Sequence, residues 1–460
     1  MPLKRPPFQP HLTRRAFLTG TALCLSGTGA GALVQVAEMR GSIDAADLGL
    51  LPGAPDDQSQ LFQRALNRSI ERGRALFLPA GDYPVANLRL PSGTMIVGVP
   101  GRTRLVYQGG GGVLASAEDV RNITLTGVTF DGANRSIGDH REGLLYFGNV
   151  SGLSIDDCIV TGSSRYGVIL DRSSGRIENS MISGAAEAAI RSNEATGLRI
   201  SGNIISDCAN GGIWIYRWTE GEDGTLVTGN RVERIGAKNG GTGQFGNGIN
   251  VFRAGNVIVS GNRISDCAFS AIRANAGSNV QITGNSCSRS GETAIYSEFG
   301  FQGALISSNI VDGGTIGISI ANFIDDGRLA VCSGNLIRNI VEDGPYPPEV
   351  AGFGIGIAAE ADTTITGNIV EGAPKFGLLL GWGPYLRNVI ASSNVLRDCG
   401  TGIAVSVVKG AGSAIISDNI IQASRLGAIY GYRWLDKSTD ELEGSGAWSH
   451  LTVRGNQISA

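Results

Sequence analysis

A cation, a phenol and a carboxylate lie close together in the middle of the chain, at Arg273, Tyr296 and Glu298. Arg273, together with Asn275, can neutralise the carboxylate of a sugar acid, while Tyr296 or Glu298 takes the adjacent proton. These are the steps of a lyase or C5-epimerase that acts on a uronic acid polymer. We therefore expect Arg273, Tyr296 and Glu298 to be catalytic.

Aromatic and planar polar side chains occupy related positions nearby. Flat aromatic faces and planar guanidinium or amide groups suit sugar rings and their hydroxyl groups. We expect a polysaccharide or cell-envelope glycan as the partner, bound by Arg191, Asn193, Trp214, Tyr216, Asn250, Phe252, Arg253, Asn275 and Asn322. The alternative is an ordinary solvated sheet face, on a protein that binds glycans without catalysis or serves as a structural surface of the cell envelope.

A glycoside hydrolase is a second alternative. Hydrolysis of a glycosidic bond requires two carboxyl groups about 5 to 9.5 Å apart. Glu298 is the only carboxylate that the sequence pattern places on this face in the central repeats, between Asn275 and Ala321. Glu360 follows in a later repeat, in a strand whose register the sequence leaves open.

The elements that position these residues are short repeated strands. An asparagine recurs, usually as Gly-Asn or Ser-Asn, at Asn179, Asn203, Asn230, Asn262, Asn285, Asn309, Asn335, Asn368, Asn394, Asn419 and Asn456. The plain copies are roughly 24 residues long, which is typical of a solenoid. Apolar and polar residues alternate over short runs between turn residues, and no copy has room for a helix.

We predict an all-β fold, a right-handed single-stranded parallel β-helix of about 12–13 coils. The asparagines are expected to stack about 4.8 Å apart and to hydrogen-bond their neighbours, with their backbone in the left-handed conformation of a turn. This ladder is structural rather than catalytic.

Aligned strands predict which side chains face outward. An apolar residue after Gly or Ala begins a strand in each coil, at Val168, Ile190, Ile213, Ile249, Ile272, Ile295, Ile318, Ile355, Leu378, Ile403 and Ile429. If each of these points inward, the residues one and three positions later point outward. Two insertions, 236–247 and 341–354, enter just before this strand in their coils. We expect them to wall a groove, since functional loops commonly lie on a rigid scaffold.

The N-terminal part divides into an export signal and a cap. Thr13-Arg14-Arg15-Ala16-Phe17-Leu18 and the modestly apolar stretch after it predict a twin-arginine signal over 1–37. The expected location is therefore periplasmic or secreted, with the twin-arginine machinery as a partner. The stretch is too rich in glycine and polar residues for a stable membrane span.

Residues 38–120 are expected to hold a capping helix and the first coils, followed by β-helix repeats over 121–460. A helical face over 56–71, with Asp57 and Gln60 as a capping box, predicts the helix that covers the open end of the stack.

At this point the chain resembles a known superfamily. The acidic-capped helix and the phrase Leu-Pro-Ala-Gly-Asp-Tyr at 78–83 resemble the N-terminus of the pectate-lyase-like right-handed parallel β-helices. The twin-arginine signal joined to Gly-Asn repeats, with phrases at 248–254 and 381–387, also resembles an uncharacterised family of twin-arginine-translocated repeat proteins. These resemblances cover nearly the whole chain and imply its fold and export.

Composition limits the remaining functions. The formal net charge is −3, which gives no electrostatic basis for nucleic-acid binding. The chain has 3 histidines and lacks the Asp-rich calcium phrase of classical pectate lyases, so we expect no metal site and no cofactor, and calcium has no support. Six cysteines are expected to be buried free thiols: Cys158, Cys208, Cys267, Cys287, Cys332 and Cys399.

Overall fold

The computed structural model describes residues 41–459 apart from 139–140, 242, 325, 348–351, 443, 445 and 447. The expected signal at 1–37 therefore lies outside the described residues. In the part of the chain that the structure describes, the helices are one α-helix, α2 (Ser59–Glu71), and one 3-10 turn, η1 (Ala45–Leu48). No helix in this part is long and apolar enough to cross a membrane.

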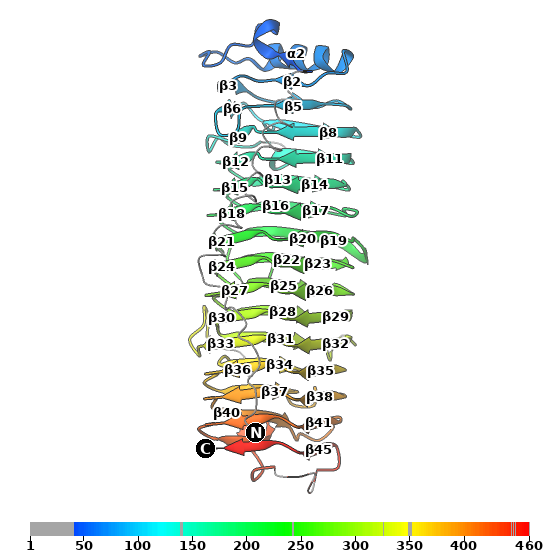
Figure 1. The fold of residues 1–460 in the computed structure, drawn as a ribbon, viewed down its shortest axis with the longest axis vertical. Coiled ribbons are helices and arrows are strands. Elements are labelled where there is room, and N and C mark those ends of the chain that lie inside the picture. The colour runs from blue at the N-terminus through cyan, green and yellow to red at the C-terminus, as the bar shows by residue number, and fades with distance from the viewer. Residues whose placement is uncertain are drawn as a thin grey trace, which may run out of the picture.

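The strands form three long sheets, and within each sheet the strands stack along the same axis (Figure 1). Sheet 1 contains, in spatial order, β1 (Ile43–Asp44), β2 (Leu76–Phe77), β5 (Met95–Val97), β8 (Arg121–Thr126), β11 (Ser151–Asp156), β14 (Gly175–Glu178), β17 (Arg199–Ser201), β20 (Leu226–Thr228), β23 (Ile258–Ser260), β26 (Val280–Thr283), β29 (Gln302–Ser307), β32 (Arg328–Ser333), β35 (Thr363–Thr366), β38 (Val389–Ser392), β41 (Ala414–Ser417) and β45 (Leu451–Arg454). Sheet 2 contains β4 (Leu88–Arg89), β7 (Ala115–Glu118), β10 (Gly143–Gly148), β13 (Tyr166–Asp171), β16 (Ala188–Asn193), β19 (Gly211–Glu222), β22 (Asn247–Gly255), β25 (Ile272–Asn275), β28 (Thr293–Glu298), β31 (Ile316–Ala321), β34 (Ile355–Ala359), β37 (Phe376–Leu380), β40 (Thr401–Ser406), β43 (Gly427–Arg433) and β44 (Asp436–Lys437). Sheet 3 contains β3 (Gly81–Val85), β6 (Thr103–Tyr107), β9 (Thr129–Asp131), β12 (Ile159–Thr161), β15 (Met181–Ser183), β18 (Ile204–Ser206), β21 (Arg231–Ile235), β24 (Arg263–Cys267), β27 (Ser286–Ser288), β30 (Ile310–Gly314), β33 (Leu336–Ile340), β36 (Ile369–Glu371), β39 (Val395–Arg397), β42 (Ile420–Gln422) and β46 (Gln457–Ser459).

From β2 to β43, successive strands of the chain fall on successive sheets. Neighbouring strands within a sheet pair in parallel, β43 with β44 excepted. This is the predicted right-handed parallel β-helix. The sheets contain 15 or 16 strands, somewhat more than the roughly 12–13 coils expected. Inward-facing isoleucine, valine and leucine side chains fill the centre of the stack. All six described cysteines are buried and free, as expected.

The asparagine ladder runs unbroken from Asn203 to Asn456. In each rung the side-chain amide donates to the carboxamide oxygen of the next asparagine, for example Asn285 Nδ2 to Asn309 Oδ1 at 3.0 Å. The same amide donates to a backbone carbonyl of the preceding coil, here Val259 O at 2.9 Å. Since these groups are buried, the ladder satisfies polar atoms that would otherwise have no partner.

Two details of the ladder prediction are wrong. Asn179 lies one position too early, because Ser180 donates its backbone N–H to Asn203 and Asn179 instead bonds Asp156. The left-handed backbone also belongs to the residue before each ladder asparagine, as at Gly284 (φ 64°). Glycine adopts that conformation without strain, which leaves the asparagine free to point inward.

Helix α2 covers one end of the stack (Figure 1), against β2, β3 and β4. It buries Phe62, Ala65, Leu66 and Ser69, which form the helical face expected within 56–71. The predicted capping box does not form. The helix begins at Ser59 after Gln58, whose side chain instead hydrogen-bonds the backbone of Leu51.

One predicted strand register is wrong, and this changes the candidate site. Ile318 pairs with Ile357, whereas Ile355 pairs with Ile316 and packs in an outward cluster. The sequence Gly354-Ile355-Gly356-Ile357 offers two Gly-Ile phrases two positions apart. From Gly356 onward a shift of two keeps the same faces, but Ile355, which was predicted to point inward, packs on the outer face at the start of the strand. Ala358 and Glu360, rather than Gly356 and Ala358, are therefore the outward pair of this coil.

Candidate functional site

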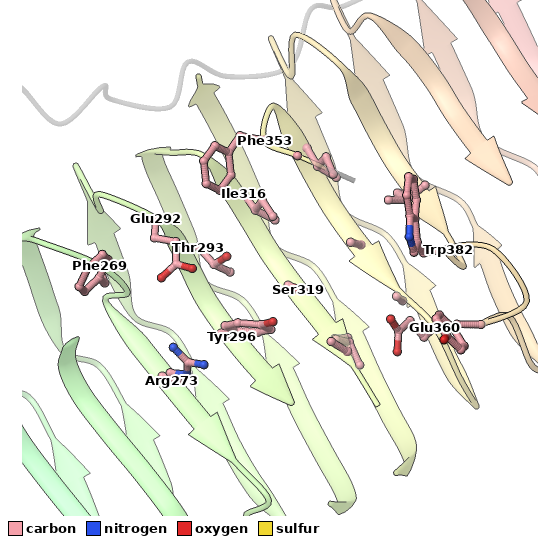
Figure 2. A pocket seen from close by; sticks show the side chains of 18 of the residues that line it. Phe269, Arg273, Glu292, Thr293, Tyr296, Ile316, Ser319, Phe353, Glu360 and Trp382 are labelled. Carbon is pink, nitrogen blue, oxygen red and sulfur yellow. The ribbon is translucent and has the colours of Figure 1, made fainter. Parts of the chain in front are cut away.

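Two cavities lie on the outward face of sheet 2. The first has a volume of about 1020 Å³ and a floor formed by β28, β31, β34 and β37. Its walls include Gly241 of the first insertion and Tyr346 and Phe353 of the second, as the insertion pattern led us to expect. In Figure 2, Arg273 and Tyr296 lie toward one end, Glu360 and Trp382 lie toward the other, and Ser319 lies between them. The first cavity thus presents charged groups at both ends of an extended floor.

Arg273, which lines this end of the first cavity, forms a buried ion pair with Glu298, which lies beneath the lining. Arg273 Nε donates to Glu298 Oε1 at 2.6 Å, and Nη2 donates to Oε2 at 3.0 Å. Asn275 Nδ2 adds a third bond to Oε1 at 2.8 Å. The side chains are 10 % and 3 % exposed, so this guanidinium already neutralises a carboxylate of the protein itself.

Tyr296 lies against the same guanidinium, with the Arg273 Cζ atom 5.0 Å from its ring centre. Burial is the main cause that raises the pKa of Tyr296 well above its ordinary value, and the charge of Glu298 adds to the shift. Tyr296 therefore stays protonated at neutral pH. That state suits hydrogen-bond donation better than proton abstraction.

Glu360 is the functional candidate that the sequence pattern left unplaced. Asn275, Glu298 and Ala321 occupy one column of sheet 2, and the pairing of Ala359 with Ile320 puts Glu360 next in that column. Glu298 and Glu360 are thus two coils apart, about 9.6 Å at the backbone. Only the small Ala321 side chain lies between them.

Burial raises the pKa of Glu360, although backbone N–H groups of Phe323 and Asn322 oppose the shift. Phe323 N donates to Glu360 Oε2 at 2.9 Å. A carboxyl group with a raised pKa beside a cavity is suited to general acid chemistry. Aromatic Trp382 and Tyr385 line the same end of the first cavity.

Glu292 is a second carboxylate that the sequence pattern did not identify, and it lies on the wall of the first cavity. Glu292 is 4 % exposed, lines the first cavity and accepts a hydrogen bond from the hydroxyl of Tyr346. The Tyr346 ring also contacts Phe269 and Phe353. Glu292 precedes its strand instead of lying within it, so strand alternation could not identify it.

The second cavity, of about 320 Å³, brings together six of the nine predicted sugar-binding residues: Arg191, Trp214, Tyr216, Asn250, Phe252 and Asn275. Their aromatic faces are largely covered. Trp214 is 2 % exposed, stacks on Tyr216 at 5.3 Å and contacts Phe245 of the first insertion. Asn250 Nδ2 donates to the Tyr216 hydroxyl at 3.1 Å. The group is thus a packed aromatic cluster with a small opening rather than an open platform.

The other three predicted sugar-binding residues lie outside the linings of both cavities. Asn193 is buried and accepts a hydrogen bond from Arg191 Nε at 3.1 Å. Arg253 donates to the backbone of Trp218 at 2.8 Å. Asn322 is 1 % exposed, and its amide pairs with both the N–H and the carbonyl of Ala361. These contacts hold turns and neighbouring strands in place.

Within the described residues, no group of three or more His, Cys, Asp or Glu side chains could hold a metal ion. The first cavity has carboxylates at Glu292 and Glu360 and a cation at Arg273. Because Arg273 is paired with Glu298, the balance of charge around the first cavity is negative. It can accept an uncharged or cationic ligand more readily than a polyanion.

Solved structures share the fold at low sequence identity. The chain is similar to an N-terminal fragment of bacteriophage phi29 gene product 12, with 16 % identity, a TM-score of 0.52, and coverage of 90 % of this chain and 76 % of that one. It is similar to PfbA, a surface adhesin of Streptococcus pneumoniae, with 12 % identity, a TM-score of 0.50, and coverage of 91 % and 99 %. The A-module of the Azotobacter vinelandii mannuronan C-5 epimerase AlgE6 matches at 16 % identity and a TM-score of 0.46, over 91 % and 99 % of the two chains.

No curated protein sequence matches this chain. A family model does match, over residues 102–232 and 218–388, and it is described as a right handed beta helix region. The matched part contains the strands that carry both cavities. The chain therefore belongs to the right-handed β-helix family.

Proposed function

We propose that this protein binds a polysaccharide in the first cavity and hydrolyses a glycosidic bond there, with Glu360 as the general acid. The observation that carries the proposal is the carboxyl group of Glu360, which has a raised pKa and lies beside aromatic residues on the floor of an extended cavity. Trp382 and Tyr385 supply the flat apolar surfaces against which sugar rings pack.

The charge of the first cavity supports hydrolysis of an uncharged glycan over the lyase or epimerase expected from the sequence. Those reactions need a cation for the uronate carboxylate, and Arg273 is already bound by Glu298. They also need a base, and the raised pKa of Tyr296 opposes that role. The carboxylate of Glu292 on the cavity wall would repel a polyuronate.

Glu298 is the second carboxylate of the proposed reaction. Glu360 donates its proton to the glycosidic oxygen, water attacks the anomeric carbon as the C–O bond breaks, and Glu298 accepts the proton that the water loses. The two backbones are about 9.6 Å apart, too far for the direct nucleophilic attack of a retaining enzyme, whose carboxyl groups are about 5 to 5.5 Å apart, so the proposed reaction is the inverting one with water between the two residues. The product is then expected with inverted anomeric configuration.

Glu360→Gln is expected to lower kcat on a neutral glycan by about a hundredfold or more, because the amide cannot donate the acidic proton. The amide oxygen can still accept the hydrogen bond of Phe323, so the fold should persist. Glu220→Gln, at an exposed carboxylate away from the first cavity, is the matched control. Reducing ends released from a panel of neutral and acidic polysaccharides give the rate, and proton NMR of the first product gives its anomer.

The pH profile is a second readout for the same residue. The acid must be protonated, so wild-type activity is expected to fall as pH rises through the raised pKa of Glu360. This fall in activity at higher pH should be absent from the residual activity of Glu360→Gln. If the wild type binds glycans without releasing reducing ends from any of them, the proposal of hydrolysis is wrong and the protein is a non-catalytic glycan binder.

We also propose export by the twin-arginine machinery to the periplasm or the cell exterior. Arg14-Arg15 and the apolar stretch after them support this, and six buried free thiols suit a protein that folds before export. Arg14→Lys with Arg15→Lys is expected to remove nearly all of the protein from the periplasmic and secreted fractions, and Arg5→Lys should leave export intact. Unchanged fractionation of the double variant would contradict this route.

A further inference from the structure

Sheet 3 carries an aliphatic surface in the C-terminal half of the stack. The first outward residues of five successive strands are aligned by register: Ile310, Leu336, Ile369, Val395 and Ile420. Ile310, Ile369 and Ile420 are 47 %, 46 % and 45 % exposed. This apolar stripe crosses β30, β33, β36, β39 and β42, which follow one another directly in sheet 3; the first three are labelled in Figure 1. Contiguous exposed apolar surface of this kind marks interaction sites.

A charged column runs beside the apolar stripe. It consists of the next outward residues of the first four strands: Asp312, Arg338, Glu371 and Arg397. The charges alternate in sign from coil to coil. Arg338 bonds Asp312 at 2.8 Å, yet the two side chains remain 50 % and 35 % exposed, so both are accessible to a partner.

We propose that the apolar stripe and the charged column form a dimer interface between two copies of this chain, packed face to face with their axes antiparallel. The twofold axis lies in the interface, parallel to the strands, between the coils of Arg338 and Glu371. Such an axis leaves each column opposite the same column of the other copy and reverses the order of the coils.

In this arrangement the apolar stripe and the charged column each face complementary residues of the partner subunit. Asp312 faces Arg397 of the partner subunit, and Arg338 faces Glu371 of the partner subunit, so each pair occurs twice. In the apolar stripe, Ile310 faces Val395 of the partner subunit, and Leu336 faces Ile369 of the partner subunit. A C2 interface is self-complementary in this way, and opposite charges fix its register.

The alternating charges disfavour packing with parallel axes and the antiparallel register that would pair all five aliphatic residues. With parallel axes, the charged column faces either itself, with like charges opposite, or the apolar stripe. With antiparallel axes centred on the coil of Glu371, that residue meets its own copy and Arg338 meets Arg397 of the partner subunit. Like charges placed opposite one another disfavour both arrangements.

The interface is small. The four paired coils, spaced about 4.8 Å apart, give a contact about 14 Å long, and the face is only a few residues wide. Interfaces at the low end of the size range are typical of weak association. A dimer that forms at micromolar concentrations is therefore expected.

Sedimentation velocity of the full chain at about 1 to 100 μM tests the charge register. Arg338→Glu and Glu371→Arg should each weaken dimerisation at least tenfold, because each places two like-charged pairs opposite one another. The double variant carrying both changes should restore the dissociation constant to within about threefold of the wild-type value. Circular dichroism and the melting temperature check that each variant is folded.

Matched aliphatic variants test the apolar stripe. Ile369→Lys should abolish the dimer, while Ile204→Lys should leave it unchanged, because Ile204 lies in the same column of sheet 3, outside the paired coils, and is 40 % exposed. A wild type that stays monomeric at 100 μM, a dimer unaffected by Ile369→Lys, or failure of the charge swap to restore dimerisation would each overturn the proposal.

Discussion

Replacing Asn285 by alanine is expected to lower the free energy of unfolding by about 3 to 5 kcal/mol, since several buried hydrogen-bonding groups lose their partners at once. The Asn285 amide donates to Asn309 Oδ1 and Val259 O. Its Oδ1 atom accepts from both the backbone N–H and the side-chain amide of Asn262. Asn285 is 1 % exposed, so water cannot replace these bonds without opening the stack.

Asn456→Ala is the matched control at the last rung. Asn456 accepts from Asn419 but is only partly buried, so water can serve the exposed groups and the expected loss is about 1 kcal/mol. Chemical unfolding followed by circular dichroism measures both variants. Because a solenoid is stabilised by contacts between adjacent coils, a central defect should matter more than a terminal one. Equal losses at the two positions would contradict a continuous ladder.

The ladder also illustrates what the repeat pattern could predict. A recurring Gly-Asn phrase with strand periodicity predicted a parallel β-helix and stacked asparagines that hydrogen-bond one another. The pattern could not assign the left-handed conformation, because Gly and Asn both tolerate it. The structure gives it to the residue before the asparagine, as at Gly284, and the asparagine uses its side chain inside the stack.

Glu360 was unplaced for a different reason. Side chains alternate with a period of two, so a register error of two residues leaves the same faces inward and is invisible to an alternation test. The insertion before Ile355 removed the spacing that aligned the other coils, and the repeated Gly-Ile phrase allowed both positions. Only the pairing of Ile357 with Ile318 assigns Glu360 to the column of Glu298.

A side chain on the outer face of a sheet is not necessarily exposed to solvent. Trp214 and Tyr216 were correctly assigned to the outer face of sheet 2, yet they are 2 % and 8 % exposed. The first insertion brings Phe245 over Trp214, and the backbone of Gln244 accepts from Asn250. The sequence showed where the insertion enters but not the direction in which it folds, which depends on tertiary contacts.

Glu298→Gln is expected to lower the free energy of unfolding by about 3 to 5 kcal/mol, because it leaves the charge of Arg273 buried without its carboxylate. The two charged side chains make the two-bond contact already described and are almost fully covered. Removal of both charges, in Arg273→Leu with Glu298→Leu, should cost much less than the sum of the two single changes. Thermal and chemical unfolding of the two single variants and the double variant give the coupling free energy.

The same double variant separates the structural role of Glu298 from its proposed chemical role. If Glu298 only balances Arg273, the double variant should recover glycan turnover along with stability. If Glu298 accepts the proton from the attacking water, turnover should stay at the level of Glu298→Gln while the melting temperature recovers. Recovery of both quantities would therefore remove Glu298 from the proposed reaction and leave Glu360 without its second carboxylate. If the double variant is folded and stable but has lost turnover, the result would support Glu298 and Glu360 as the two catalytic carboxylates on either side of Ala321.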